Sequence, residues 1–237
     1  MLRFDIITIF PEIFDSYLKE SLILRARKKK LIKIKIHNLR KWTKDRHKTV
    51  DDRPFGGGLG MVVKLEPIFK AISSLTKLKI KNEKLKITKP KTKIILFTPR
   101  GKKFNQRMAY RFSKLDRLIM ICGRYEGVDE RVAKYVADEM ISIGDYDLMG
   151  GELPAMVIIE TAARLVPGVI GKPEFLKERI TKERGFIEYP QYTRPEIFSP
   201  KKGVYWKVPK VLSSGYHQKI EDWRKKHMKV IGKERNL

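Results

Sequence analysis

Two short apolar segments, each followed by a glycine-containing loop, most constrain what this chain can fold into. They are Leu118–Cys122 and Met140–Ile143, within residues 117–155. Gly123 follows the first segment and Gly144 ends the run of the second. Glycine at a strand end allows the backbone to approach a ligand closely. Loops at the carboxyl ends of neighbouring parallel strands form the ligand sites of open α/β sheets, so this stretch predicts a binding site.

The two loops share a composition that supports this interpretation. Aromatic and acidic residues recur in both, at 124–126 and at 145–147, and the second loop closes at Gly150–Gly151. Pro154 then opens an apolar helix, where its missing N–H leaves nothing unpaired. The alternative, that both loops are ordinary strand-to-helix turns, does not explain why the same set of residues occurs twice.

Apolar periodicity predicts alternating strands and helices along the first two thirds of the chain. Strands are expected at 2–9, 32–36 and 93–97 in addition to the two above, and helices at 11–18, 65–78, 104–115, 129–136 and 155–166. A third strand-end loop is expected at 98–101, and a lysine-rich surface hairpin or excursion at 77–93. The pattern is typical of an α/β domain with a mainly parallel sheet, over residues 1–166. Residues 167–200 are interpreted as a linker and residues 201–237 as a small helical domain.

Charge indicates the kind of partner. Lys and Arg number 53 against 27 Asp and Glu, which gives a net charge of +26. A field of this strength favours a polyanion, and nucleic acid is the expected partner. The alternative is a generally lysine-rich proteome, from codon usage or a hot habitat.

The segment 37–61 has no useful periodicity and ends in a glycine cluster. Loops of this length are usually functional. Its cations could meet phosphates, and Trp42 and Phe55 could stack on bases. The cations are Arg40, Lys41, Lys44, Arg46, His47 and Lys48. The alternative is a solvated flexible loop.

Several classes of protein are disfavoured by what the sequence lacks. No run of about 18 apolar residues suggests a membrane span, and the first residues are typical of a strand and not of a signal peptide. We therefore expect a cytoplasmic protein. Cys122 is the single cysteine, so no intrachain disulfide is expected, and the four histidines show no metal-ligand spacing. Neither G-x-G-x-x-G after the first strand nor a Walker motif occurs, which argues against a dinucleotide dehydrogenase or a P-loop enzyme.

Five sequence blocks together resemble one family. They are DDRPFGGGLGM (51–61), CGRYEGVDERV (122–132), SIGDYDLMGGELPA (142–155), YPQYTRPEIF (189–198) and SSGYHQKIEDWR (213–224). Their content and order are similar to those of the TrmD family of tRNA (guanine-N(1)-)-methyltransferases, in the SPOUT superfamily. The resemblance implies a trefoil-knotted α/β domain and a homodimer whose active site lies at the subunit interface. It also implies methylation of the guanine at tRNA position 37 when another guanine precedes it.

The resemblance implies that S-adenosyl-L-methionine is the methyl donor, bound among the three strand-end loops; Mg²⁺ is considered as a further component. The implied cofactor-binding residues are Leu96, Thr98, Pro99, Gly123, Tyr125, Glu126, Ser142, Ile143, Gly144, Asp145, Tyr146, Leu148, Gly150, Gly151 and Pro154. The implied tRNA-binding residues are Arg46, His47, Asp52, Arg53, Gly57, Gly58, Arg194, His217, Trp223 and Arg224. The C-terminal module is expected to be short for the family.

Two catalytic residues are expected from the resemblance. Arg164 matches the family arginine that stabilises charge developing on the guanine O6; an i,i+4 pair with Glu160 is the alternative. Arg179 stands where the family has its general-base aspartate, so we expect the adjacent Glu178 to act as the base. Glu174 and Glu183 are rivals, and a surface role for Glu178 is the alternative.

Two other functions are kept as alternatives. The altered linker would suit a weakened member of the superfamily that binds tRNA without efficient methylation. A different nucleotide-using α/β enzyme is disfavoured by the missing phosphate fingerprint.

Overall fold

The structure of the chain is a computed structural model that describes residues 1–76, 78–81, 84–87, 91–172, 174, 180–181 and 185–231. For residues 78–81 and 84–87 it describes the backbone alone. The chain divides into two compact units, Met1–Pro173 and Glu174–Leu237. None of the helices in these described ranges is long and apolar enough to cross a membrane.

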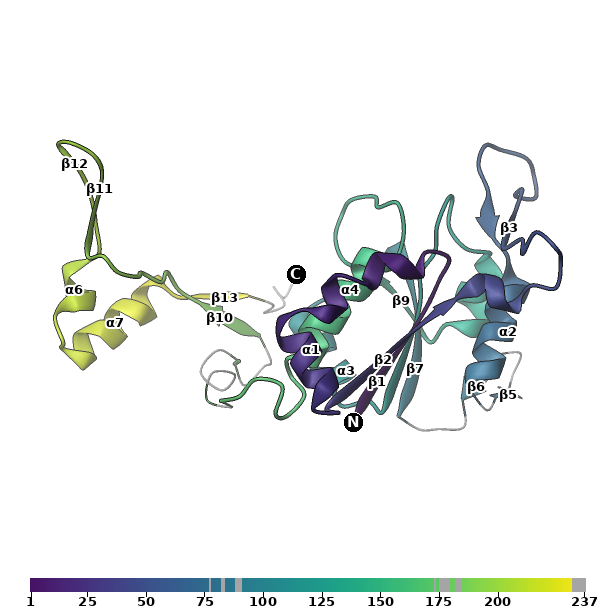
Figure 1. The fold of residues 1–237 in the computed structure, drawn as a ribbon, viewed down its shortest axis with the longest axis horizontal. Helices are drawn as coiled ribbons and strands as arrows, with labels where there is room; N and C mark the ends of the chain where they lie inside the picture. Colours follow the sequence, from purple (N-terminus) through teal and green to yellow (C-terminus); the bar gives the residue numbers. More distant parts are fainter. Residues whose placement is uncertain are drawn as a thin grey trace, which may run out of the picture. The chain divides into compact units, whose positions relative to one another are not determined.

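A parallel five-stranded sheet forms the centre of the larger unit (Figure 1). Its strands lie in the order β2-β1-β8-β7-β9, and every neighbouring pair is parallel. Their bounds are β1 Leu2–Thr8, β2 Ile32–Asn38, β7 Thr92–Lys103, β8 Arg117–Ile121 and β9 Glu139–Ser142. The predicted α/β class and its mainly parallel sheet are confirmed. All five carboxyl ends lie at one edge of the sheet.

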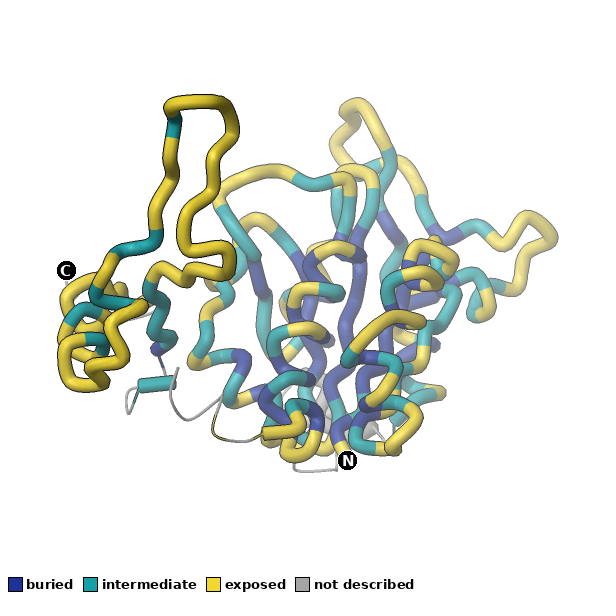
Figure 2. The backbone as a smooth tube through the Cα atoms, turned by 60° about the vertical axis from the view of Figure 1, so that its left-hand side comes forward, coloured by how far each residue is buried: buried dark blue, intermediate teal, exposed yellow. Residues whose placement is uncertain are grey.

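Side chains of the sheet alternate between two apolar cores, one on each face. In β8, Leu118 and Met120 belong to one core, and Ile119 and Ile121 belong to the other. The alternation follows from the two-residue period of a strand. Because both faces are covered at the centre of the sheet, β7 and β8 contain continuous apolar runs, whereas the edge strand β2 alternates isoleucine with lysine. Figure 2 shows the buried residues concentrated along these strands.

Helices cover both faces of the sheet (Figure 1). The first face packs against α1 (Ser21–Lys28), α3 (Gln106–Ser113) and α4 (Glu152–Ala163). The opposite face packs against α2 (Leu65–Leu75). Shorter turns complete the cover: η1 Pro11–Phe14, η2 Tyr17–Lys19, η3 Leu39–Trp42 and the π-helical η4 Val132–Val136. The buried side chains of α4 recur every three to four residues, so one side of this helix faces the sheet.

Two antiparallel strand pairs lie outside the parallel sheet in the larger unit. β3 (Asp51–Asp52) pairs with β4 (Val62–Val63), and β5 (Leu78–Lys81) pairs with β6 (Lys84–Ile87). The second pair confirms the hairpin expected in the lysine-rich stretch. β4 is also bound to the loop after β8, because the Val63 N–H donates to the Gly127 oxygen at 3.0 Å.

The smaller unit contains helices and strands. Its helices are α6 (Lys210–Ser213) and α7 (His217–His227). β10 (Phe186–Glu188) pairs with β13 (Lys229–Ile231), and β11 (Ile197–Lys201) pairs with β12 (Val204–Lys207). The C-terminal domain that was expected to be small and helical also contains strands. Among the described residues of this unit, Gly185 alone is buried.

For two segments of the larger unit the prediction of a helix is wrong. Residues 11–18 form the turns η1 and η2, which bury one apolar side chain each, Phe14 and Leu18. Residues 129–136 form only the short π-helical turn η4. In both segments a single turn is enough to bury the apolar side chains, so no continuous helix is required. α1 has no counterpart among the expected helices, because three of its eight residues are basic and it buries only two side chains.

The loop expected at 98–101 is a bulge within β7. Phe97 and Lys102 are both paired with Ile141 of β9, so the residues between them are extra on the β7 side. Gly101 is needed at this point, because a Cβ there would lie 2.5 Å from the Ile141 nitrogen. The strand therefore continues past the bulge.

Asp5 is a buried carboxylate in β1, and three basic side chains surround it. Its Oδ1 accepts a hydrogen bond from Arg3 at 2.8 Å and lies 2.6 Å from His37 Nε2. Its Oδ2 accepts one from Arg117 Nε at 2.6 Å. Burial alone would raise the pKa of Asp5, but the hydrogen bonds with His37, Arg3 and Arg117 outweigh it and lower the pKa well below its ordinary value. The carboxylate stays charged and joins β1 to β2 and β8.

Removing this carboxylate should destabilise the larger unit. Asp5→Ala leaves Arg3 and Arg117 without their anion, and we expect the free energy of unfolding in urea at pH 7 to fall by about 3 kcal/mol. Asp15, which is exposed and lies 3.9 Å from Lys19, supplies the control. Asp15→Ala should cost about 0.5 kcal/mol or less. Equal losses in the two variants would contradict the role of Asp5.

The pH dependence of the same comparison has a defined sign. The folded pKa of Asp5 lies below the unfolded value of about 3.9. Its contribution to stability is therefore complete above that pH and is lost as the pH falls toward the folded pKa. The difference between wild type and Asp5→Ala should shrink below about pH 4.

Candidate functional site

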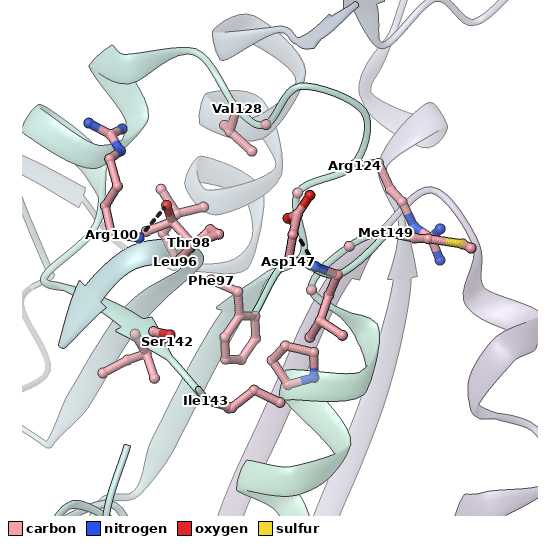
Figure 3. Close-up of a pocket in the computed structure, with 18 of the residues that line it drawn as sticks. Leu96, Phe97, Thr98, Arg100, Arg124, Val128, Ser142, Ile143, Asp147 and Met149 are labelled. Atoms are coloured by element: carbon pink, nitrogen blue, oxygen red, sulfur yellow. Dashed lines mark hydrogen bonds between the residues drawn. The ribbon is translucent and has the colours of Figure 1, made fainter. Parts of the chain in front are cut away.

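The carboxyl ends of three neighbouring strands, β8, β7 and β9, surround a cavity of about 350 Å³. Figure 3 shows Leu96 and Phe97 from β7 and Ser142 and Ile143 from the end of β9 around this space. The volume falls in the range of small-molecule sites. The position is also the one at which open parallel sheets bind ligands.

The loop after β8 forms one wall of the cavity. The Gly123 oxygen accepts a hydrogen bond from the Gly151 N–H at 3.0 Å. Tyr125 has a positive φ of 59°, which non-glycine residues seldom adopt. The Glu126 N–H donates to the Met61 oxygen at 3.0 Å, so the segment before β4 supports the loop from behind.

The loop after β9 forms the opposite wall. Ser142 Oγ donates to the Gly144 oxygen at 2.9 Å, and the Tyr146 hydroxyl donates to the Ile143 oxygen at 3.2 Å. A Cβ at Gly144 would lie 2.2 Å from the Tyr146 ring, so a side chain at this position would displace that ring. In Figure 3 the dashed bond from the Leu148 N–H to Asp147 Oδ1, 2.9 Å long, lies in this wall.

Glu152, in the first turn of α4, joins the two walls. It is 1% exposed. Thr8 Oγ1 donates to its Oε1 at 2.6 Å, and Arg124 Nε donates to its Oε2 at 3.0 Å. The Arg124 guanidinium also lies 4.8 Å from the centre of the Phe10 ring. One carboxylate thus connects the end of β1, the loop after β8 and α4.

The cavity gathers carboxylates although the chain is strongly basic. Glu126, Glu130 and Asp147 line it. Glu130 pairs with Arg100 at 2.5 Å, whereas neither Glu126 nor Asp147 forms an ion pair with the residues that the structure describes. Two carboxylates without a cation favour a ligand that carries positive charge.

Cys122 lies beneath the cavity and does not act as a nucleophile. Burial raises the pKa of its thiol well above the ordinary value, and the Glu152 carboxylate adds to this effect. The thiol is therefore protonated. The side chain packs in the core, as the sequence predicts.

The structure brings together nearly all of the expected cofactor-binding residues. All of them line the cavity except Asp145, which is exposed and pairs with Lys103 at 2.5 Å. Phe97, Arg124 and Asp147 also line the cavity and lie within the three loops predicted to bind the cofactor. The lining residues that sequence reasoning missed are Arg100, Gly127, Val128, Glu130, Ile141 and Met149. The signal that could have found them is their place in or beside the strand ends and loops that hold the predicted cofactor-binding residues.

The two expected catalytic residues are not part of this cavity. Arg164 is the C-terminal cap of α4, whereas Pro154 at the other end of the helix lines the cavity. Ten residues of helix correspond to a separation of about 15 Å. Glu178 lies outside the described residues, as do Arg179 and Glu183. Glu174 is exposed.

Glu160 does not form the i,i+4 ion pair with Arg164 that the sequence allows, within the part of the chain that the structure describes. Its carboxylate instead accepts a hydrogen bond from the Tyr17 hydroxyl. Burial raises the pKa of Tyr17, and the bond to Glu160 raises it further. Arg164 is half-buried.

The expected RNA-binding residues of the larger unit lie on one exposed segment. Arg46, His47, Asp52, Arg53, Gly57 and Gly58 are all exposed. Asp52 pairs with Lys64 at 3.4 Å. Phe55 is fully exposed, as a stacking role requires. Trp42 is half-buried, and its Nε1 donates to Ser74 Oγ at 2.9 Å.

The expected RNA-binding residues of the smaller unit form a separate group. Trp223 stacks on His227 with ring centres 4.2 Å apart, and Tyr192 meets it edge-on at 6.1 Å. The Arg224 guanidinium lies 5.5 Å from the centre of the Tyr189 ring. Arg194 and His217 are exposed.

No group of three or more His, Cys, Asp or Glu side chains placed to hold a metal ion occurs among the described residues. The carboxylates that line the cavity favour a cationic small molecule. The net positive charge of the chain favours a polyanion as a second partner.

Comparisons with known proteins agree on one family. The family model described as tRNA (Guanine-1)-methyltransferase TrmD matches residues 2–236. A protein of Dictyoglomus turgidum named tRNA (guanine-N(1)-)-methyltransferase is 51% identical over 226 residues, which cover 95% of this chain and 84% of that protein. One of the same name from Geobacter sp. strain M21 is 46% identical, covering 95% and 84%. One from Clostridioides difficile is 44% identical, covering 100% and 96%.

The close approach at Gly151 should not tolerate a side chain. A Cβ at this position would lie 2.7 Å from the Cys122 Cα, so the backbone must shift. We expect Gly151→Ala to lower the free energy of unfolding by about 2 kcal/mol in urea denaturation. Gly171, where a Cβ meets nothing within 4 Å, is the matched control and Gly171→Ala should be neutral. If Gly151→Ala were as stable as Gly171→Ala, the loops could move apart at no cost in stability, and the prediction would be contradicted.

Proposed function

The chain belongs to the TrmD family of tRNA (guanine-1)-methyltransferases, and from this premise we propose that it transfers a methyl group from S-adenosyl-L-methionine to N(1) of a guanine in tRNA. We further propose, from the resemblance of its sequence blocks, that the target is guanine 37 following a guanine. The methyl donor supplies a methyl group already activated on a positively charged sulfur.

The observation that carries the proposal is the cavity at the ends of β7, β8 and β9. Its volume of about 350 Å³ suits a nucleoside-sized ligand. Glu126 and Asp147 would favour the sulfonium charge, and Leu96 and Pro154 offer apolar contact. Gly144 and Gly150 keep the walls close, because a Cβ at either position would meet a neighbouring side chain.

Methylation at N(1) requires two further functions from the protein. A neutral guanine carries a proton on N(1), which a base must accept, and negative charge that develops on O6 must be stabilised. We assign the second function to Arg164 and the first to Glu178. Position 37 lies in a loop, so moving its base into a site costs less than opening a duplex would.

The position of Arg164 supports a site that is completed by a second copy of the chain. About 15 Å of helix separates Arg164 from its own cavity, so the arginine of a partner subunit is the better candidate to act there. Exposed apolar side chains beside the cavity also favour a homodimer: Met149 is 86% exposed and Leu153 57%. The trefoil knot is proposed on the family resemblance.

The charge of +26 supports tRNA as the partner, and the proposed place of action is the cytoplasm. We propose that a requirement for Mg²⁺ be tested by comparing methyl transfer with added Mg²⁺ and with a chelator. A binding protein that has lost catalysis is less well supported, because every relative reported above is named a methyltransferase.

The proposed activity is tested with two tRNA transcripts and radiolabelled S-adenosyl-L-methionine. One transcript has guanine at position 37 after guanine 36, and the other has adenine at position 37. We expect label in the first alone, at N(1). Binding of both ligands without any transfer would contradict the proposal and support the binding-only alternative.

The catalytic assignment makes a separate prediction. Arg164→Ala and Glu178→Gln should each lower kcat by about 100-fold or more, with the Kd for S-adenosyl-L-methionine unchanged. Glu174→Gln, in the same segment as Glu178, is the control and should retain kcat. Gly151→Ala disturbs the cavity wall and should abolish donor binding. Mixing it with Arg164→Ala should restore activity, because a mixed dimer holds one intact cavity and one intact Arg164. Full turnover by Glu178→Gln would exclude that residue as the base.

A further inference from the structure

A hairpin in the smaller unit presents aromatic rings to solvent. β11 and β12 join at Lys202–Gly203, where Gly203 has a positive φ of 84°. In Figure 1 the hairpin projects from α6 and α7 of the same unit, and Figure 2 shows that nearly all of it is exposed. Ser199 Oγ lies 3.0 Å from the carbonyl oxygens of Lys201 and Val204. This contact spans the bulge between the strands and holds the shape of the hairpin without covering its rings.

Phe198 and Trp206 form a ring pair on one face of this hairpin. They are opposite each other in the strand register, with ring centres 5.7 Å apart and planes inclined by 41°. Phe198 is 50% exposed and Trp206 64%. Tyr205 is 59% exposed, and it lies on the other face because neighbouring strand residues alternate. Paired rings with this much exposure indicate a surface that a partner covers.

The charge around the ring pair is positive. Residues 197–220 contain no Asp or Glu. Their lysines are Lys201, Lys202, Lys207, Lys210 and Lys219. An identical hairpin from a second copy of the chain would bring the same charge and be repelled. A partner that combines negative charge with flat aromatic faces fits instead, and unpaired RNA has both properties.

We propose that the β11–β12 hairpin binds unpaired nucleotides of the tRNA substrate. Bases stack on the Phe198–Trp206 pair, and Lys201 and Lys202 at the end of the hairpin meet the phosphates beside them. The inference rests on the proposed function, because it takes tRNA as the partner. The hairpin does no chemistry in this view. It holds tRNA in place, so it contributes to the affinity for tRNA and not to the rate of the bound complex.

The test uses the full-length protein with Phe198→Ala and Trp206→Ala together. The ligand is the transcript with guanine at positions 36 and 37. Loss of stacking should raise the Kd and KM for tRNA by about tenfold or more. The kcat at saturating tRNA and the Kd for S-adenosyl-L-methionine should stay unchanged. The single variant Trp206→Phe, with Phe198 intact, keeps a flat ring and should retain most of the affinity for tRNA.

Tyr205→Ala is the matched control, since it removes a ring of similar exposure from the opposite face. It should change the Kd for tRNA by about twofold or less. Raising the salt concentration should weaken tRNA binding less steeply when Lys201 and Lys202 are both replaced by alanine. Circular dichroism of each variant checks that the unit is folded.

Two results would overturn the proposal. One is an unchanged Kd for tRNA in the folded double variant. The other is a changed oligomeric state of that variant in sedimentation without RNA, which would make the ring pair a contact between protein chains. Failure of the proposed function is distinguishable from both, because wild-type protein would then transfer no methyl group to either transcript.

Discussion

The contact between Gly123 and Gly151 is the constraint on which the candidate site depends. Their backbones are joined by a hydrogen bond of 3.0 Å, and neither position leaves room for a side chain. This contact fixes the start of α4 against the end of β8. Glu152, one residue later, is thereby placed to bind Arg124 and Thr8. Because Thr8 ends β1 and Arg124 follows β8, the cavity walls are attached to the sheet itself. Attachment of the walls to the sheet suits a reaction that depends on holding two substrates in line.

Charge is distributed so that one protein can attract two unlike substrates. The chain as a whole carries +26, which draws in a polyanion. The cavity is the exception, since Glu126 and Asp147 line it without a cation partner among the described residues. A uniformly basic surface would repel a cationic methyl donor. Carboxylates concentrated between close loops create a local field of the opposite sign. The two regions of opposite charge therefore favour different substrates, RNA on the basic surface and the cationic methyl donor in the cavity.

The sequence was informative where burial and backbone geometry act together. The central strands β7 and β8 are apolar on both faces, so they stand out as runs, and glycines mark the strand ends where loops approach each other. The rest depended on contacts between distant residues. Arg124 and Glu152 pair across 28 positions, and Asp5 meets Arg117 across 112, which no local pattern reveals. The bulge in β7 needs the register with β9 to be visible. The β11–β12 hairpin was missed because none of its residues is buried, so alternation carries no apolar signal.

The smaller unit shows a different balance of forces from the larger one. Gly185 is its one buried residue among those described, so apolar burial contributes little to its stability. Its order comes from surface pairings, such as Trp223 on His227 and Ser213 with Glu196. Contacts of this kind are weak in water and strengthen when a partner excludes solvent. A partner that covered this surface and excluded water would therefore strengthen the pairings that order the unit.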